Sequence, residues 1–127
     1  MTRIRELSHQ FRRPQYPVLV DLDERLVAAK SAKSLLQKLS DLELPVNTDY
    51  PVIDVTGEGW GLYLFPSAAV LSPMAVKKRW SKREVIHLYN ERKNRSKDDS
   101  LYSEKSLSSK RLDRIIGEIA ELLLEAE

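Results

Sequence analysis

The sequence predicts an α+β domain in which a small sheet of about three strands packs against helices. Two observations support this fold class. Residues 59–76 carry no charge, although 31% of the chain is charged. Near the C-terminus, apolar residues recur at helical spacing more regularly than anywhere else. We therefore expect a buried strand at the centre of the fold and an amphipathic helix at the end of the chain.

The composition is that of one globular domain. At 127 residues, with 42% apolar residues, the chain is long enough for a single core. We expect one domain over residues 1–127, with residues 1–15 as a mobile N-terminal arm because they show no clear period. The absence of cysteine excludes disulfides and thiolate metal sites and fits a cytoplasmic location. Two prolines and several small polar residues in the charge-free stretch argue against a membrane span.

The first regular elements are predicted near the N-terminus. Residues 16–20 (YPVLV) are short and apolar, which indicates a buried strand. Asp21 then has the position of a helix N-cap, with Glu24 three residues later as in a capping box. Apolar residues continue from there at steps of three and four. We therefore expect a helix over about 22–40.

A central β-hairpin is predicted over residues 50–55 and 60–65. Two β-rich runs flank a glycine-containing turn, which is a hairpin signal. The turn lacks the Lys-Ser/Thr pair of a phosphate-binding loop. The second run, WGLYLF, is apolar on both faces, as in a central strand covered by helices or by a helix and a partner subunit. We expect Leu62, Leu64 and Phe65 to be buried.

Three further helices are predicted in the second half of the chain. Ser72 followed by Pro73 favours a helix over 73–79, and Ser81 with Glu84 forms a second capping-box spacing before a helix over 82–94. The periodic apolar residues at the end predict a helix over about 105–126. The two helices around Trp80 also suggest a helix-turn-helix.

Positive charge is concentrated in one part of the chain. The net charge is only +2, yet residues 77–97 carry nine basic and two acidic groups, with two aromatic residues among them. Basic and aromatic side chains together suit phosphate contact and base stacking. The alternative is that this segment pairs with acidic residues of the last helix, Glu118, Glu121 and Glu125. The candidate contact residues for nucleic acid or an acidic partner are Lys77, Lys78, Arg79, Trp80, Lys82, Arg83, Arg92 and Lys93.

No motif in the sequence specifies a reaction. His9 and His87 lie far apart, and neither has a second histidine at metal-ligand spacing. We expect no metal, no cofactor and no catalytic site. An enzyme that uses carboxylates would draw on Asp21, Asp23 and Asp54, but their spacing alone does not predict a common site.

Three functional hypotheses follow. The leading one is a small non-enzymatic regulatory or adaptor protein that self-associates and contacts an acidic partner, for which nucleic acid is one candidate, through residues 77–97. The second is a protein-protein interaction or assembly module that does not bind nucleic acid. The third is a small carboxylate-dependent enzyme. We expect a homodimer because three consecutive leucines, residues 122–124, widen the apolar face of the last helix.

Overall fold

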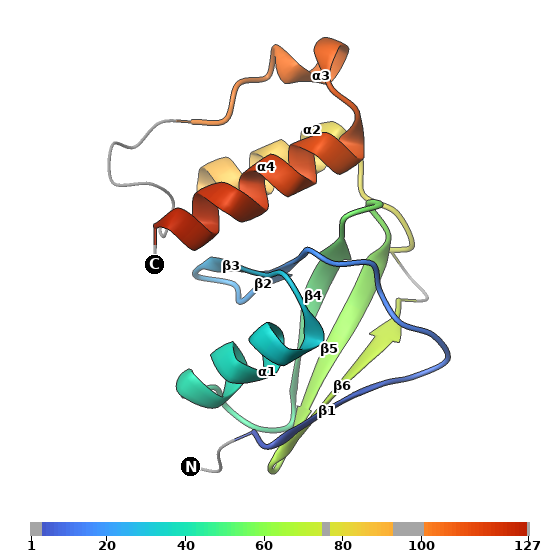
Figure 1. Ribbon diagram of the computed structural model, residues 1–127, viewed down its shortest axis with the longest axis vertical. Coiled ribbons are helices and arrows are strands. Elements are labelled where there is room, and N and C mark those ends of the chain that lie inside the picture. Colours follow the sequence, from blue (N-terminus) through green and yellow to red (C-terminus); the bar gives the residue numbers. More distant parts are fainter. Residues whose placement is uncertain (1–3, 75–76, 93–100, 127) are drawn as a thin grey trace.

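One curled six-stranded sheet forms the centre of the protein. The computed structural model describes residues 4–74, 77–92 and 101–126. The strand order is β1-β6-β5-β4-β2-β3 (Figure 1). β1 and β6 run parallel, and every other neighbouring pair is antiparallel. The strands are β1 (Glu6–His9), β2 (Val18–Asp21), β3 (Leu26–Ala29), β4 (Thr48–Asp54), β5 (Gly59–Phe65) and β6 (Ala68–Pro73).

Helices cover both faces of the sheet at the β2–β3 end. In Figure 1, β2 and β3 lie between α1 on one side and the pair α2 and α4 on the other. Among the described residues, none of the helices is both long and apolar enough to cross a membrane. The helices are α1 (Ala32–Asp41), α2 (Lys82–Glu91), α3 (Ser106–Ser109) and α4 (Leu112–Glu125).

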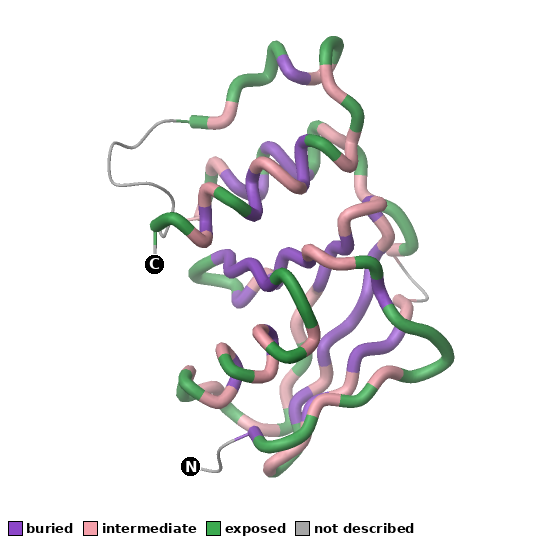
Figure 2. The backbone as a smooth tube through the Cα atoms, viewed as in Figure 1, coloured by how far each residue is buried: buried purple, intermediate pink, exposed green. Residues whose placement is uncertain are grey.

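Alternating side chains of the central strands divide the interior into two cores. Val20 and Leu62 belong to the core beneath α1, together with Leu39 from that helix. Leu19 points to the opposite face and belongs to the core formed with α2 and α4, which includes Ile116. The buried positions along β2, β3 and β5 and on the inner sides of α2 and α4 are visible in Figure 2.

The prediction of a three-stranded sheet is wrong. The strands expected over residues 16–20, 50–55 and 60–65 correspond to β2, β4 and β5, and the sheet is completed by β1, β3 and β6. β1 has a short polar sequence and pairs at the edge of the sheet with β6, Glu6 lying opposite Ala68. Its pairing is with a strand about 60 residues away, so no local sequence pattern marks it.

The helix predicted over 22–40 is also wrong in its first half. Asp21 ends β2, and its Oδ1 accepts a hydrogen bond from the Asp23 amide at 3.0 Å across a tight turn. Asp23 has φ of 75°, and β3 follows as the second strand of a hairpin. The helix begins ten residues later than its predicted start, at Ala32, where the Ser31 side chain accepts from the Ser34 amide. Asp21 therefore stabilises a β-turn and is not a helix cap.

The helix predicted over 73–79 is replaced by the end of β6. Pro73 is the last residue of that strand and lies opposite Trp60 of β5. The described part of the following segment, residues 77–80, is extended. The helix-turn-helix hypothesis is therefore wrong. The cap at Ser81 is confirmed, because α2 begins at Lys82 with a complete capping box.

Two details of the remaining elements differ from expectation. The helix predicted over 105–126 is divided into α3 and α4, and the one predicted over 82–94 has Glu91 as its last residue. Leu62 and Leu64 are buried as predicted, at 0% and 1% exposure, whereas Phe65 is 46% exposed. Phe65 points to the sheet face opposite Leu64, and this part of that face belongs to neither core cluster of the described residues.

Candidate nucleic-acid interface

Three segments that are distant in sequence meet at the turn between β4 and β5. The Gly59 amide donates to the Lys78 carbonyl at 2.9 Å, and the Trp80 amide donates to the Gly57 carbonyl at 2.8 Å. On the other strand, the Val55 amide donates to the Gln15 carbonyl at 3.1 Å. The hairpin turn thus fixes both the loop after β1 and the extended segment that precedes α2.

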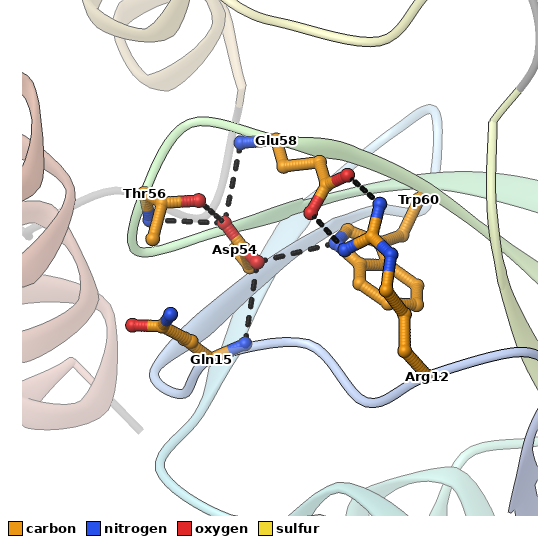
Figure 3. A network of polar contacts seen from close by, with 6 residues as sticks. All are labelled: Arg12, Gln15, Asp54, Thr56, Glu58 and Trp60. Carbon is orange, nitrogen blue, oxygen red and sulfur yellow. Dashed lines mark hydrogen bonds and ion pairs between the residues drawn. The ribbon is translucent and has the colours of Figure 1, made fainter.

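Asp54 organises the inside of this turn (Figure 3). Its carboxylate is 1% exposed. Oδ1 accepts from the Thr56 amide at 2.9 Å, the Thr56 hydroxyl at 2.5 Å and the Glu58 amide at 3.2 Å. Oδ2 accepts from the Gln15 amide and the Trp60 indole, both at 3.2 Å. Five donors satisfy this buried carboxylate, so its role is to hold the turn and the loop together.

Arg12 lies over the same turn from outside. Its guanidinium forms a bidentate ion pair with Glu58, in which Nη1 donates to Oε1 at 2.6 Å, and it lies 5.0 Å from the centre of the Trp60 ring (Figure 3). The paired guanidinium holds the pKa of Glu58 below its ordinary value. The bidentate geometry and the aromatic contact both fix the orientation of the loop around Arg12.

That loop presents an aromatic side chain to solvent. Phe11 is 88% exposed and has φ of 70°, a conformation that is uncommon for a bulky residue. Its neighbours Arg12 and Arg13 are also exposed. At the base of the loop, His9 Nε2 lies 3.4 Å from the Tyr16 hydroxyl. The pKa of His9 is lowered, mainly by burial and to a smaller extent by the positive charge of Arg13. This loop lies outside the segment predicted to make contacts, although an aromatic residue beside two arginines is a signal visible in the sequence.

The extended segment before α2 carries the exposed cations that the sequence predicted. Lys78, Arg79 and Arg83 are exposed and form no ion pair with any described residue. Arg79 forms an isolated β-bridge with Glu58, the partner of Arg12, and so links this segment to the loop after β1. We refer to Phe11, Arg12, Arg13, Lys78, Arg79 and Arg83 as the basic surface.

The start of α2 increases the positive potential of the basic surface. The Ser81 side chain accepts from the Glu84 amide, and the Glu84 side chain accepts from the Ser81 amide. Lys82 and Arg83 occupy the first turn of the helix, where the positive end of the helix dipole disfavours cations. Neither side chain helps the helix to form at this position, and of the two only Arg83 is exposed and has no ion pair with a described residue.

The other predicted contact residues have partners within the chain. Lys77 pairs with Glu84 and lies 4.6 Å from the centre of the Trp80 ring, which is partly buried against the α2–α4 core. The Lys82 ammonium donates to the Leu107 carbonyl at 3.0 Å. All three of these side chains are only partly exposed, whereas Lys78, Arg79 and Arg83 are exposed and form no ion pair with a described residue.

Arg92 lies apart from this group. It forms a bidentate ion pair with Asp21 at 2.9 and 2.8 Å, with both side chains largely buried. Lys93 falls outside the described residues. The acidic residues of α4 form no ion pair with the described part of the predicted basic segment, residues 77–92. Glu118 pairs with Lys110 and Arg114, and Glu121 and Glu125 form no ion pair with any described residue.

The three aspartates of the enzyme hypothesis do not form one site. Asp54 lies opposite Val18, so Asp21 is three residues further along β2, about 10 Å away, and on the other face of the sheet. Asp21 and Asp23 line an open depression of about 430 Å³ with Asp49, but Asp21 is already paired with a guanidinium. Among the described residues, no three histidine, aspartate or glutamate side chains are placed to hold a metal ion.

The comparisons with known proteins identify no relative. No protein-family model, curated protein or solved structure matches the chain. The geometry and charge of the basic surface are therefore the basis on which a function can be proposed.

Proposed function

We propose that the protein is a non-enzymatic adaptor that binds single-stranded nucleic acid through the basic surface. The observation that supports this most directly is the exposed Phe11 ring, 88% accessible and next to Arg12 and Arg13. An aromatic side chain in a cationic loop offers the combination used for stacking a base while neighbouring guanidinium groups contact phosphates. An acidic protein would be attracted by the charges but would gain less from an exposed ring that can stack on an unpaired base.

The charge distribution supports the same proposal. Lys78, Arg79 and Arg83 form no ion pair with any described residue, although the charge of Arg79 acts on Glu58. Two of them are held in an extended segment by backbone pairing with the hairpin turn. Because that segment is anchored, its side chains lose less conformational freedom on binding than those of a free tail. Together with Arg13 they provide four cations for phosphate contacts.

The proposal is tested by the salt dependence of binding to a fluorescent single strand. Four phosphate contacts on a single strand predict a slope of about −3 in a plot of log K against log salt, at about −0.7 per contact. A triple variant, Lys78→Ala, Arg79→Ala, Arg83→Ala, should reduce the slope to about −1 and weaken binding at low salt. The fold should remain intact, because these three side chains are exposed.

A matched control removes the same charge elsewhere. Arg5, Arg25 and Lys33 are exposed residues beside β1, in the β2–β3 turn and on α1. Replacing them with alanine changes the net charge by the same amount and should leave the slope nearly unchanged. If both triple variants weaken binding equally, the interaction is non-specific attraction to net charge. Failure of the wild-type protein to bind single strand or duplex at low salt removes nucleic acid as the partner.

Replacing Phe11 distinguishes the contribution of base stacking to binding from that of charge attraction. Phe11→Ala should weaken single-strand binding about fivefold or more, since a stacked base is worth about 1–3 kcal/mol. Duplex binding should hardly change, because paired bases are not available for stacking. An equal effect on both would show that Phe11 only shapes the loop.

An assembly module that does not bind nucleic acid is the second candidate. It is favoured by the uncovered part of the sheet, where Phe65 is 46% exposed beside Tyr63 and Val70, which are partly exposed. Replacing Phe65 with aspartate should then abolish partner capture without affecting nucleic-acid binding. Self-association, expected from the sequence, is proposed as a property independent of either function.

A further inference from the structure

An open groove runs along one side of α4. It encloses about 510 Å³ between that helix and the strand ends that carry Pro17 and Lys30. The helix side of the groove is a stripe at steps of three and four, which is a single face of an α-helix. Its members are Arg114, Gly117, Glu121 and Leu124, with Glu118 and Ala120 beside them. From Arg114 to Leu124 the helix side of the groove spans almost three helical turns, about 15 Å.

Gly117 lies in the middle of this stripe, and the fold of the described chain does not require it. A glycine inside a helix costs about 1 kcal/mol relative to alanine. A Cβ added to Gly117 would meet no atom within 4 Å, and the residue does not have a positive φ. A missing side chain on an open helix face permits close approach by another backbone, and that use would account for the glycine.

Three charges along α4 are placed against its dipole. Arg114 lies near its start, and Glu121 and Glu125 lie near its end, where the last turn contains no basic residue. Each of these three positions is unfavourable for an isolated helix, whereas Asp113 in the first turn is favourably placed and pairs with Arg111, the N-cap. The same pattern becomes favourable when two such helices lie antiparallel, because the basic start of each then faces the acidic end of the other.

The spacing of the charges matches such a pairing about Gly117. Arg114 and Glu121 are equally far from the point between residues 117 and 118, so reversing the helix about that point places each where the other was. Glu121 forms no ion pair with any described residue, and Arg114 contacts Glu118 only through Nε at 3.0 Å. Both groups therefore have hydrogen-bonding capacity that the described part of the chain does not use.

We propose that a second copy of this chain docks in the groove, with the two α4 helices antiparallel across a twofold axis at Gly117. Arg114 pairs with Glu121 of the partner subunit, and the symmetry forms the same pair twice. Gly117 permits the close approach at the centre, and Leu124 adds an apolar contact near the end of the stripe. The interface is separate from the basic surface, so a loss of self-association and a loss of nucleic-acid binding are independent results.

Charge reversal tests this pairing. Arg114→Glu and Glu121→Arg should each place like charges opposite each other twice and weaken dimerisation about tenfold or more. The two single variants mixed in equal amounts should form a heterodimer, because both of its contacts are then between opposite charges. The double variant should dimerise by itself. Within one chain Arg114 and Glu121 are about 10 Å apart along the helix and do not contact each other. If the single variants only damaged the monomer, neither the mixture nor the double variant would restore dimerisation.

A steric variant and a charge control complete the experiment. Gly117→Leu fills the space in which the helices meet and should give a folded monomer, as measured by light scattering at about 100 micromolar and by circular dichroism. Lys33→Glu, on the exposed face of α1, should leave the dimer unchanged. A monomeric wild-type protein, a dimer that survives Gly117→Leu, or a mixture of single variants that stays monomeric would each overturn the proposed interface.

Discussion

Gly59 lies directly against the main-chain carbonyl of Lys77. A Cβ added to Gly59 would collide with that oxygen, and no rotation of a side chain could relieve the contact, since the obstacle is backbone. The Gly59 amide also donates to the Lys78 carbonyl at 2.9 Å. This glycine of the hairpin turn is therefore needed for the close approach of the segment that carries part of the basic surface.

Gly59→Ala should separate residues 77–80 from the hairpin. The forced contact should lower the free energy of unfolding by about 1–3 kcal/mol, as for other overpacked sites. Binding to single-stranded nucleic acid should fall as well, because Lys78 and Arg79 lose their anchored geometry. Urea denaturation measures the loss of stability, and fluorescence titration measures the loss of binding.

Gly117→Ala is the matched control, since there the added Cβ meets open space. In dilute solution it should stabilise the fold by up to about 1 kcal/mol through helix propensity. If Gly59→Ala is as well tolerated as this control, the contact with Lys77 does not constrain the basic segment.

Asp54→Asn should destabilise the protein by about 2–3 kcal/mol, because an amide NH₂ would face donors that now share a carboxylate, and an unsatisfied buried donor costs about 1–3 kcal/mol. If the NH₂ group takes the place of Oδ2, the bonds from the Gln15 amide and the Trp60 indole are both lost. If it takes the place of Oδ1, the amides of Thr56 and Glu58 lose their acceptor instead. Chemical denaturation measures the effect. The exposed Asp49 provides the control, where the same substitution should change stability by less than about 0.5 kcal/mol.

Local signals predicted the parts of the fold that depend on neighbouring residues. The hairpin of β4 and β5 follows from a glycine turn between two β-rich runs, and α2 follows from Ser81 and Glu84 at capping-box spacing. In both cases the residues that cause the structure lie within a few positions of each other. The sequence alone was therefore sufficient for these elements.

The failures have a common physical origin in ambiguous apolar runs. The four apolar residues of β3, Leu26–Ala29, fit either a helix or a strand that is buried on both sides. Asp21 and Ser72 are each typical of a helix start, but the same groups also stabilise turns and end strands. Burial of β3 in both cores and the pairing of Ser72 with Gly61 of β5 decided these cases. The helices and strands that cover β3 lie elsewhere in the chain, so this burial is not encoded in any short window.

The candidate site was predicted only in part, for the same reason. A run of basic residues is visible in sequence, so Lys78, Arg79 and Arg83 were identified. The contribution of Phe11 and Arg12 depends on the ion pair between Arg12 and Glu58, which joins positions 46 residues apart. An ion pair between residues so far apart in the sequence cannot be predicted from the periodicity or spacing of residues.

Leu64 and Phe65 are neighbours at the end of β5, and the stability of the fold should respond differently when each is replaced by alanine. Leu64 is 1% exposed, and Leu64→Ala should cost about 2–5 kcal/mol as a buried large-to-small change. Phe65 is 46% exposed on the opposite face, and Phe65→Ala should cost less than about 1 kcal/mol. Equal losses in urea denaturation would show that the outer face of β5 is packed against something in solution, such as another subunit.

The acid sensitivity of the C-terminal helices should depend on Glu118. Its carboxylate accepts from the Lys110 ammonium at 2.7 Å, the Tyr102 hydroxyl at 2.6 Å and the Arg114 guanidinium at 3.0 Å. These contacts, with Lys110 the largest, lower the pKa of Glu118 from 4.5 to about 2. A lowered pKa in the folded state means that folding favours the charged form. The stabilisation is therefore complete above about pH 4.5 and is lost as the pH falls towards about 2.

Glu118→Gln removes this pH-dependent stabilisation. At neutral pH the variant should be less stable by about 0.5–1 kcal/mol, a modest value because water screens a side chain that is one-third exposed. The difference between wild type and variant should shrink between about pH 4.5 and 2, as the wild-type carboxylate becomes protonated. Glu121→Gln, at a position without an ion pair among the described residues, should show no such convergence in dilute solution. Parallel pH profiles for wild type and Glu118→Gln would mean that the Lys110 contact does not persist in solution.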